Sequence, residues 1–200
     1  MQEKMLTISL FALSGLAIAF SSIVMSFVMF SLGRERLHFL WGVFCISVFT
    51  WGIGCFFIGT TRDPATADFW WRITHIGIAL IPALFLDFVT TFLKIKRGWA
   101  LYAFYALAIC FGLLAVSSNL LIAHMRFVFN SFYYDSPPGI LYPLFTTYFF
   151  GLIVYSHYLL YKSYRGERVI DDTTRLERAR IAYFFLGMLI SFAGGSMCFL

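Results

Sequence analysis

The feature that most constrains this chain is a series of six long apolar runs, which occupy most of its 200 residues. A helix that crosses the roughly 30 Å hydrocarbon layer of a membrane needs about 20 apolar residues, and each run reaches that length. The runs are continuous and do not alternate with polar residues, which favours helices over barrel strands. The predicted spans are about 6–32, 37–59, 69–93, 98–121, 140–161 and 181–200. We therefore expect an all-α, polytopic membrane bundle that forms a single domain over residues 1–200.

The low charge content excludes the main soluble classes. Only 12% of the residues are charged and 60% are hydrophobic, whereas a soluble domain has about 25% charged residues. A soluble globule, a disordered tail and a disulfide-rich secreted mini-protein are therefore excluded. The first run is too long for a cleaved signal peptide and follows no basic segment, so we expect it to be retained.

The basic residues predict an orientation. Eleven of the 15 Lys and Arg residues follow the first, third and fifth spans, and cytoplasmic loops carry such an excess. The N-terminus is therefore predicted to lie outside, and the net charge of +5 is attributed to loops that contact anionic lipid heads of the bilayer. Because the basic residues are spread over short loops, no nucleic-acid partner is expected. The tryptophans mark span ends, except for Trp51, which falls in mid-span.

The third span carries the candidate sensing residues. Asp68, Arg72 and His75 follow an i, i+4, i+7 spacing on one helix face, so Arg72 is expected to pair with Asp68 or to snorkel. Asp68 is also a candidate N-cap. Pro82 frees a backbone carbonyl near mid-span. Asp87 is the only acid well inside an apolar run; it either contacts a proton or a ligand, or is structural and bonded to a neighbouring helix.

Two further patterns concern packing. Gly187, Ser191 and Gly195 recur every four residues in the sixth run, as Gly15 and Ala19 do in the first. Small residues at this spacing permit close helix contacts, either within the bundle or in a homodimer. The long connection 122–139 is rich in aromatic residues, so it is expected to lie at the membrane interface or to fold back over the bundle.

Chemistry-bearing groups are sparse. The four cysteines and four histidines are dispersed; a haem held by His38 and His157 is less favoured than hydrogen-bonded or interfacial histidines. No nucleophile–base pair, metal-ligand cluster, phosphate-binding loop or paired carboxylates occur. We therefore predict no catalytic, metal-binding or cofactor-binding residue, and no enzyme activity within residues 1–200.

Several stretches give the chain a family resemblance. They are Trp71-Arg72, Gly77–Pro82 and Leu84–Phe88 in the third span, Trp51–Gly54, Pro138–Tyr142, the basic positions Arg175, Arg178 and Arg180, and Gly194-Gly195. Together they resemble the N-terminal seven-helix membrane region of bacterial histidine kinases, which also occurs fused to diguanylate cyclases. Asp87 departs from the expected pattern, in which this position is variable and often histidine-like, so it is not predicted to be a family-wide ligand.

The resemblance implies a sensory and anchoring module in the bacterial cell membrane, with a seventh helix beyond Leu200 and a cytoplasmic output domain. The implied partners are an unidentified small-molecule or membrane-derived stimulus and a response regulator that the output domain would serve. The output domain is unidentified, so the activity of a longer protein stays open. Two alternatives also remain: a small transporter or channel that uses Asp87, and a membrane enzyme or cofactor-bearing photoreceptor or redox protein.

Overall fold

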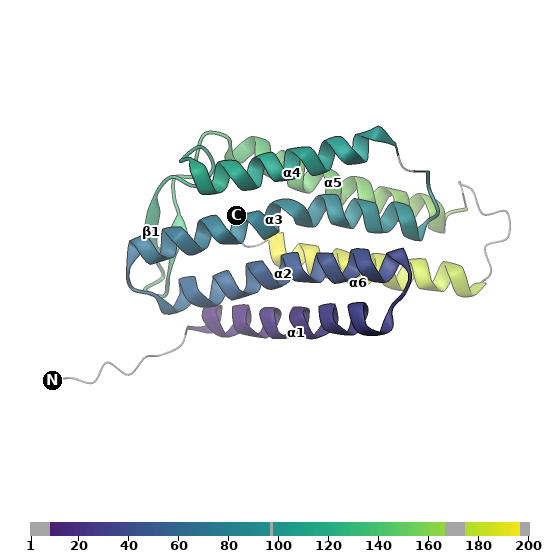
Figure 1. The fold of residues 1–200 in the computed structure, drawn as a ribbon, viewed down its shortest axis with the longest axis horizontal. Helices are drawn as coiled ribbons and strands as arrows, with labels where there is room; N and C mark the ends of the chain where they lie inside the picture. The colour runs from purple at the N-terminus through teal and green to yellow at the C-terminus, as the bar shows by residue number, and fades with distance from the viewer. Residues whose placement is uncertain (1–8, 97, 167–174, 197–200) are drawn as a thin grey trace.

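The computed structural model describes residues 9–96, 98–166 and 175–196, which form six helices and one β-hairpin. The helices run side by side along one long axis (Figure 1). Their bounds are α1 Leu10–Leu32, α2 Arg36–Thr60, α3 Pro64–Phe92, α4 Trp99–Ser117, α5 Tyr142–Tyr164 and α6 Arg175–Ser196; the strands are β1 Met125–Val128 and β2 Phe132–Asp135. The predicted all-α bundle is confirmed.

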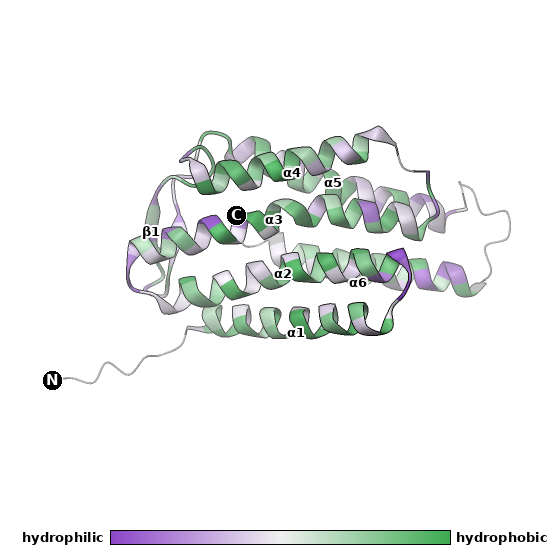
Figure 2. Cartoon of the chain, viewed as in Figure 1, coloured by the Kyte–Doolittle hydropathy of each residue, from purple (hydrophilic) through white to green (hydrophobic). Residues whose placement is uncertain are grey.

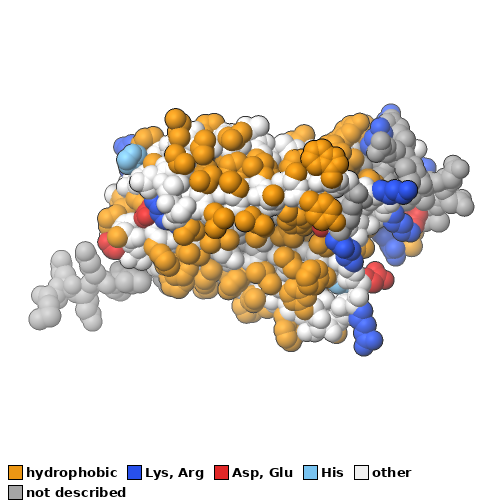
Figure 3. Space-filling model, turned by 45° about the horizontal axis from the view of Figure 1, so that its top comes forward, with side chains coloured by type: hydrophobic (Ala, Val, Ile, Leu, Met, Phe, Trp, Pro, Cys, Tyr) orange, Lys and Arg blue, Asp and Glu red, His pale blue; other side chains and the backbone are white. Residues whose placement is uncertain are grey.

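Within the described residues, α1 to α4 are long and apolar enough to cross a membrane. Helix α5 contains many hydroxyl groups together with His157, and α6 begins with the charged segment 175–180, so neither reaches the same apolar content. Hydrophilic residues concentrate near the helix ends (Figure 2). Large exposed hydrophobic side chains cover the flanks between them, as expected for a surface in contact with lipid (Figure 3).

Helix α3 begins about one turn before the predicted span. Asp63 is its N-cap, because the carboxylate Oδ2 accepts hydrogen bonds from the Thr66 amide at 2.8 Å and the Thr66 hydroxyl at 2.6 Å. Pro64 follows at the first helical position, where a missing N–H costs nothing. The prediction that Asp68 caps this helix is therefore wrong. The two bonds from Thr66 lower the pKa of the Asp63 carboxyl from its ordinary value.

Helices α1 and α2 pack with their backbones in contact. A Cβ atom at Gly52 would lie 2.6 Å from the Ala19 amide nitrogen, and one at Gly15 would lie 2.8 Å from the Gly52 carbonyl oxygen. Ser26 strengthens the contact, since its hydroxyl donates to the Gly42 carbonyl at 3.0 Å. This contact is the small-residue packing expected between membrane helices, and Gly15 and Ala19 take part in it.

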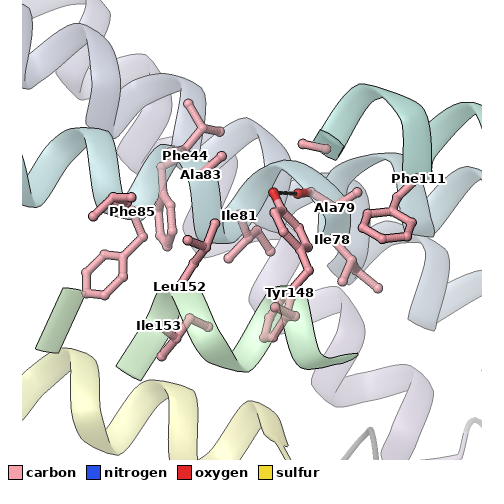
Figure 4. Packing of buried hydrophobic residues seen from close by; sticks show 14 of the residues in the cluster. Phe44, Ile78, Ala79, Ile81, Ala83, Phe85, Phe111, Tyr148, Leu152 and Ile153 are labelled. Atoms are coloured by element: carbon pink, nitrogen blue, oxygen red, sulfur yellow. Dashed lines mark hydrogen bonds between the residues drawn. The ribbon is translucent and has the colours of Figure 1, made fainter. Parts of the chain in front are cut away.

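Helix α3 contacts α2, α4 and α5, and most of its middle is buried. The core around it is apolar and rich in phenylalanine, and Phe85 and Phe145 are fully buried. Figure 4 shows part of this core, with Phe44, Phe85 and Phe111. Helix α6 joins this core through large rings: Phe184 packs on Trp41 and Phe88, and Phe192 packs on Phe85 at a centroid distance of 4.9 Å.

The aromatic connection 122–139 contains the antiparallel hairpin, with Met125 opposite Asp135. It folds back over the bundle, as one of the two expectations stated. Phe132 stacks on Phe11 of α1 at 4.1 Å, and the Trp71 indole of α3 donates to the Tyr133 carbonyl at 2.9 Å. We call this the hairpin end. The α1–α2 connection, the C-terminal ends of α3 and α5 and the start of α6 lie at the opposite, basic end, where Lys and Arg side chains gather (Figures 1 and 3).

Candidate functional site

The four predicted sensing residues all lie on α3, but they do not converge on one site. Arg72 and Asp87 are 15 positions apart, which corresponds to roughly 22 Å along a helix. Arg72 and His75 belong to the hairpin end, Pro82 lies in the middle of the helix, and Asp87 lies toward the basic end. The structure therefore separates two polar clusters by an apolar core.

Arg72 uses its guanidinium to join α3 to the end of α4. Its Nε donates to Asp68 Oδ2 at 2.7 Å, which confirms the predicted pair. Its Nη1 donates to the carbonyls of Ala115 at 3.0 Å and Ser118 at 2.7 Å, and its Nη2 donates to the Asn119 side chain at 2.8 Å. The last carbonyls of a helix lack intrahelical donors and carry partial negative charge, so a cation stabilises them. Arg72 thus holds α4 against α3.

His75 lies one turn further along α3 and is buried. Its Nδ1 is 2.8 Å from the Trp71 carbonyl oxygen, a contact that requires Nδ1 to carry the proton. Its Nε2 is buried and has no hydrogen-bond partner among the described residues. The ring instead packs near Trp71 and Phe145, with centroids 5.8 Å away in each case. His75 is therefore enclosed by aromatic side chains and lies apart from the contacts of Arg72.

The hairpin adds an acid that the sequence interpretation did not single out. Asp135 is buried, and its Oδ1 accepts hydrogen bonds from the amides of Ala123 and His124 at 3.0 and 2.8 Å. Burial raises the pKa of this carboxyl above its ordinary value, although the two amide bonds act against that shift. Asp135 fixes the chain between α4 and β1, and its position beside a Pro-Gly turn gives no sequence signal for that role.

Pro82 interrupts the hydrogen bonding of α3 at the level of α5. Proline has no N–H to donate to the carbonyl four residues earlier. One position along, the Tyr148 hydroxyl of α5 donates to the Ala79 carbonyl at 3.0 Å (Figure 4). A second carbonyl, that of Phe104 in α4, is 3.4 Å from the same hydroxyl. Close to the carbonyl that Pro82 frees, the Tyr148 hydroxyl thus brings α3, α4 and α5 together at one polar contact.

Asp87 is buried and bonded to two neighbouring helices. Its Oδ2 accepts from the Tyr105 hydroxyl of α4 at 3.1 Å and is 3.6 Å from the Arg36 guanidinium of α2. Its Oδ1 accepts from the Thr91 hydroxyl at 3.3 Å. Only 3% of the residue is exposed. These contacts satisfy the polar needs of a buried carboxylate and join α2, α3 and α4 near the basic end.

Two members of this second cluster were not predicted. Arg36 was counted only among the basic residues of the loops. It is the first residue of α2 and lies at the same end of the bundle as Asp87, and this shared level in the membrane is the signal that could have indicated the pair. Tyr105 had no signal, because tyrosines are common in these spans. The Thr91 hydroxyl contacts the carboxylate, whereas the Thr90 hydroxyl donates to the Asp87 backbone carbonyl at 3.0 Å.

The small residues of α6 face different surroundings. A Cβ atom at Gly187 would meet nothing within 4 Å, whereas one at Gly195 would lie 3.3 Å from the Trp51 ring. The Ser191 hydroxyl donates to the Gly187 carbonyl at 2.9 Å. Helix packing through all three positions stays a prediction.

Metal-ligating and thiol groups are dispersed in the described part of the chain. Those residues hold no group of three or more His, Cys, Asp or Glu side chains that could bind a metal. Cys45, Cys55 and Cys110 are not joined in disulfides, while Cys198 lies outside the described residues.

The comparison with known families covers nearly the whole chain. A family model described as the N-terminal 7TM region of histidine kinase matches residues 11–200. No curated protein and no solved structure matches the chain.

Proposed function

Since the chain belongs to the family of N-terminal seven-transmembrane regions of histidine kinases, we propose that it is the sensory and anchoring module of a bacterial two-component sensor kinase. The match over residues 11–200 is the observation that carries this proposal, and the helical bundle with four apolar spans agrees with it. The module would receive a stimulus in the membrane and relay it to a cytoplasmic output domain. That domain would in turn address a response regulator.

The charge distribution supports an orientation for this module. Arg34, Arg36, Lys94 and Lys162 lie in or beside the connections at the basic end, opposite the hairpin. An excess of Lys and Arg is typical of cytoplasmic loops. We infer that the hairpin end and the N-terminus face the outside of the bacterial cell membrane, and that the basic end faces the output domain.

The packing suggests which element transmits the signal. Polar contacts join α2, α3 and α4 near the basic end through Asp87, and join α3 to α4 near the hairpin end through Arg72. Helix α6 packs on α2 and α3 through the rings of Phe184 and Phe192. A stimulus that binds two positions of α6 with different affinity would shift the equilibrium between them. In this proposal α6 moves against a fixed α2–α3–α4 unit.

The test is the output of the intact protein, measured as kinase autophosphorylation in membranes. Asp87→Asn removes the negative charge of this ion pair, and Arg36→Gln removes its positive charge. Each variant is expected to change the ratio of stimulated to basal output at least threefold. Arg34→Gln is the matched control, because Arg34 lies two residues away and is exposed.

Two results would contradict the proposal. Unchanged output from Asp87→Asn, Arg36→Gln and Arg72→Gln at normal membrane levels would remove these residues from signalling. Substrate flux into liposomes that depends on Asp87 would instead favour a transporter.

A further inference from the structure

A groove of about 320 Å³ lies between α1 and α6, and we call it the α1–α6 groove. Its floor consists of side chains from α2, α3 and α5, such as Phe44 and Ile78. Its rims are exposed and are formed by Ser21 and Met25 of α1 and by Ser191 of α6. Its described lining residues include no Lys, Arg, Asp, Glu or His. Because a cavity of about 150 Å³ accommodates benzene, the groove has room for about two large apolar side chains.

Three small residues of α6 beside the groove face outward. Gly187, Ser191 and Gly194 are exposed, and a Cβ atom at either glycine would meet nothing within 4 Å. The Ser191 hydroxyl donates to the Gly187 carbonyl at 2.9 Å, so it needs no further polar partner. Small residues at this spacing let the backbones of two membrane helices approach closely. Gly15 and Gly52 already serve that purpose between α1 and α2, whereas the small face of α6 contacts none of the described helices.

Helix α1 presents a comparable face on the other side of the groove. Its exposed residues include Ser14, Ala17 and Ser21, at an i, i+3, i+7 spacing. The hydroxyls of Ser14 and Ser21 donate to carbonyls one turn earlier in α1, at 2.8 and 3.1 Å. Both sides of the groove therefore carry small residues whose hydroxyls are bonded within their own helix, which suits contact with an apolar helix.

One membrane helix of the matched family region is not among the six described helices. The family model describes a seven-transmembrane region. A membrane helix needs about 20 residues, and each range outside the described residues is much shorter than that: 1–8, 97, 167–174 and 197–200. We propose that the α1–α6 groove is the docking site of the seventh helix, which follows Leu200 in the intact protein.

The course of α6 supports this occupant. Helix α6 runs from the basic end toward the hairpin end (Figure 1). Near its end, Gly195 lines the groove, and a Cβ atom there would lie 3.3 Å from the Trp51 ring of α2. The chain from Ser196 to Leu200 spans at most roughly 14 Å. A helix that follows therefore starts close to the groove, and consecutive elements of a fold are usually adjacent in space.

The seventh helix would place α6 between two neighbours. It would contact α1 on one side and the small face of α6 on the other, and its large apolar side chains would enter the groove beside Phe44 and Met188. From the hairpin end it would return to the basic end, where the output domain is proposed to lie. This inference rests on the proposed function and deepens it, because it names the element through which a movement of α6 reaches the output domain.

The position of the seventh helix is tested by photo-crosslinking of the intact protein in membranes. The crosslinking amino acid p-benzoyl-L-phenylalanine replaces Met25 on one rim or Ser191 on the other. Each variant should form an intramolecular crosslink to a peptide beyond Leu200, identified by mass spectrometry. The same amino acid in place of Ile109, on an exposed face of α4, is the control and should not reach that peptide.

The small face of α6 is tested by filling it. Gly187→Leu adds a side chain where the six described helices leave open space, but where a docked helix would collide with it. The yield of the crosslink from position 25 should decrease at least fivefold. Gly151→Leu of α5 is the matched control, since a Cβ there also meets nothing within 4 Å, and it should leave the yield unchanged.

Crosslinks from both rims to lipid alone, or to a second copy of the chain, would overturn the proposal. So would equal yields in Gly187→Leu and Gly151→Leu. These results leave the proposed function intact, because the variants of Asp87 and Arg36 test that function through kinase output and not through the position of a helix.

Discussion

The α1–α2 contact and the attachment of α6 are two opposite ways of packing a membrane helix. Between α1 and α2 the backbones touch through Gly15, Ala19 and Gly52, so the two helices have one permitted separation. Helix α6 is held by the rings of Phe184 and Phe192, which pack on rings of α2 and α3. We expect the small-residue contact to fix its two helices more tightly than the ring contacts fix α6.

The largest effect is expected where backbones touch. Gly52→Leu places a side chain at a point where even a Cβ would lie 2.6 Å from the Ala19 nitrogen, and the helices must separate. We expect a loss of about 3 kcal/mol in the free energy of unfolding, measured by denaturation in mixed micelles. Gly151→Leu is the control, since a Cβ there meets nothing within 4 Å. Equal losses in both variants would remove the distinction between the two modes of packing.

A smaller loss is expected from Arg72→Gln, which leaves the carbonyls of Ala115 and Ser118 without their cation. We expect about 2 kcal/mol of destabilisation, with hydrogen exchange increasing at the end of α4. Arg62→Gln is the matched arginine at the same end; its bond to the Ser131 carbonyl is exposed, so its loss should be under about 0.5 kcal/mol. If the two variants prove alike, Arg72 does not hold α4.

A substitution in the ring contacts of α6 should affect signalling more than stability. Phe184→Leu keeps an apolar side chain but removes the ring that packs on Trp41 and Phe88. We expect only about 1 kcal/mol of destabilisation, together with a clear change in the basal autophosphorylation of the intact protein. Val154→Ala, on an exposed face of α5, should change neither quantity. A large loss of stability with unaltered basal output would mean that α6 is as firmly packed as α1.

The smallest effects are pH-dependent and of opposite sign at two acids of the hairpin end. The pKa of Asp135 is raised by burial, so its stabilising contribution is present below its ordinary pKa of 3.8 and is lost as the pH rises. The pKa of Asp63 is lowered by Thr66, so its contribution is present above 3.8 and is lost on acidification. Relative to wild type, Asp135→Asn should therefore become more stable as the pH rises from 4 to 7.

Asp63→Asn should show the reverse trend: relative to wild type it should become more stable as the pH falls below 3.8, where the wild-type contribution is lost. Thermal unfolding of both variants and wild type at several pH values measures the two slopes. Parallel slopes would contradict the opposite environments of the two carboxyls.

The sequence predicted the bundle well because apolar length is a local property. The described helices coincide with the predicted spans to within about four residues, apart from the early starts of α3, which Asp63 causes, and of α6, which begins at Arg175. Contacts between helices could not be predicted in the same way. The pair of Arg72 with Asp68 is local and was foreseen, whereas the approach of Arg36 and Tyr105 to Asp87 depends on how three helices are arranged.

The hydroxyl of Tyr148 has a consequence for motion within the core. It carries a single proton, and the carbonyls of Ala79 and Phe104 compete for it at 3.0 and 3.4 Å. A tilt of α5 toward α4 could exchange one acceptor for the other, so the hydroxyl is never stranded in the apolar interior. Tyr148 therefore has two acceptors within reach, one on α3 and one on α4, and its hydrogen bond does not depend on a single position of α5.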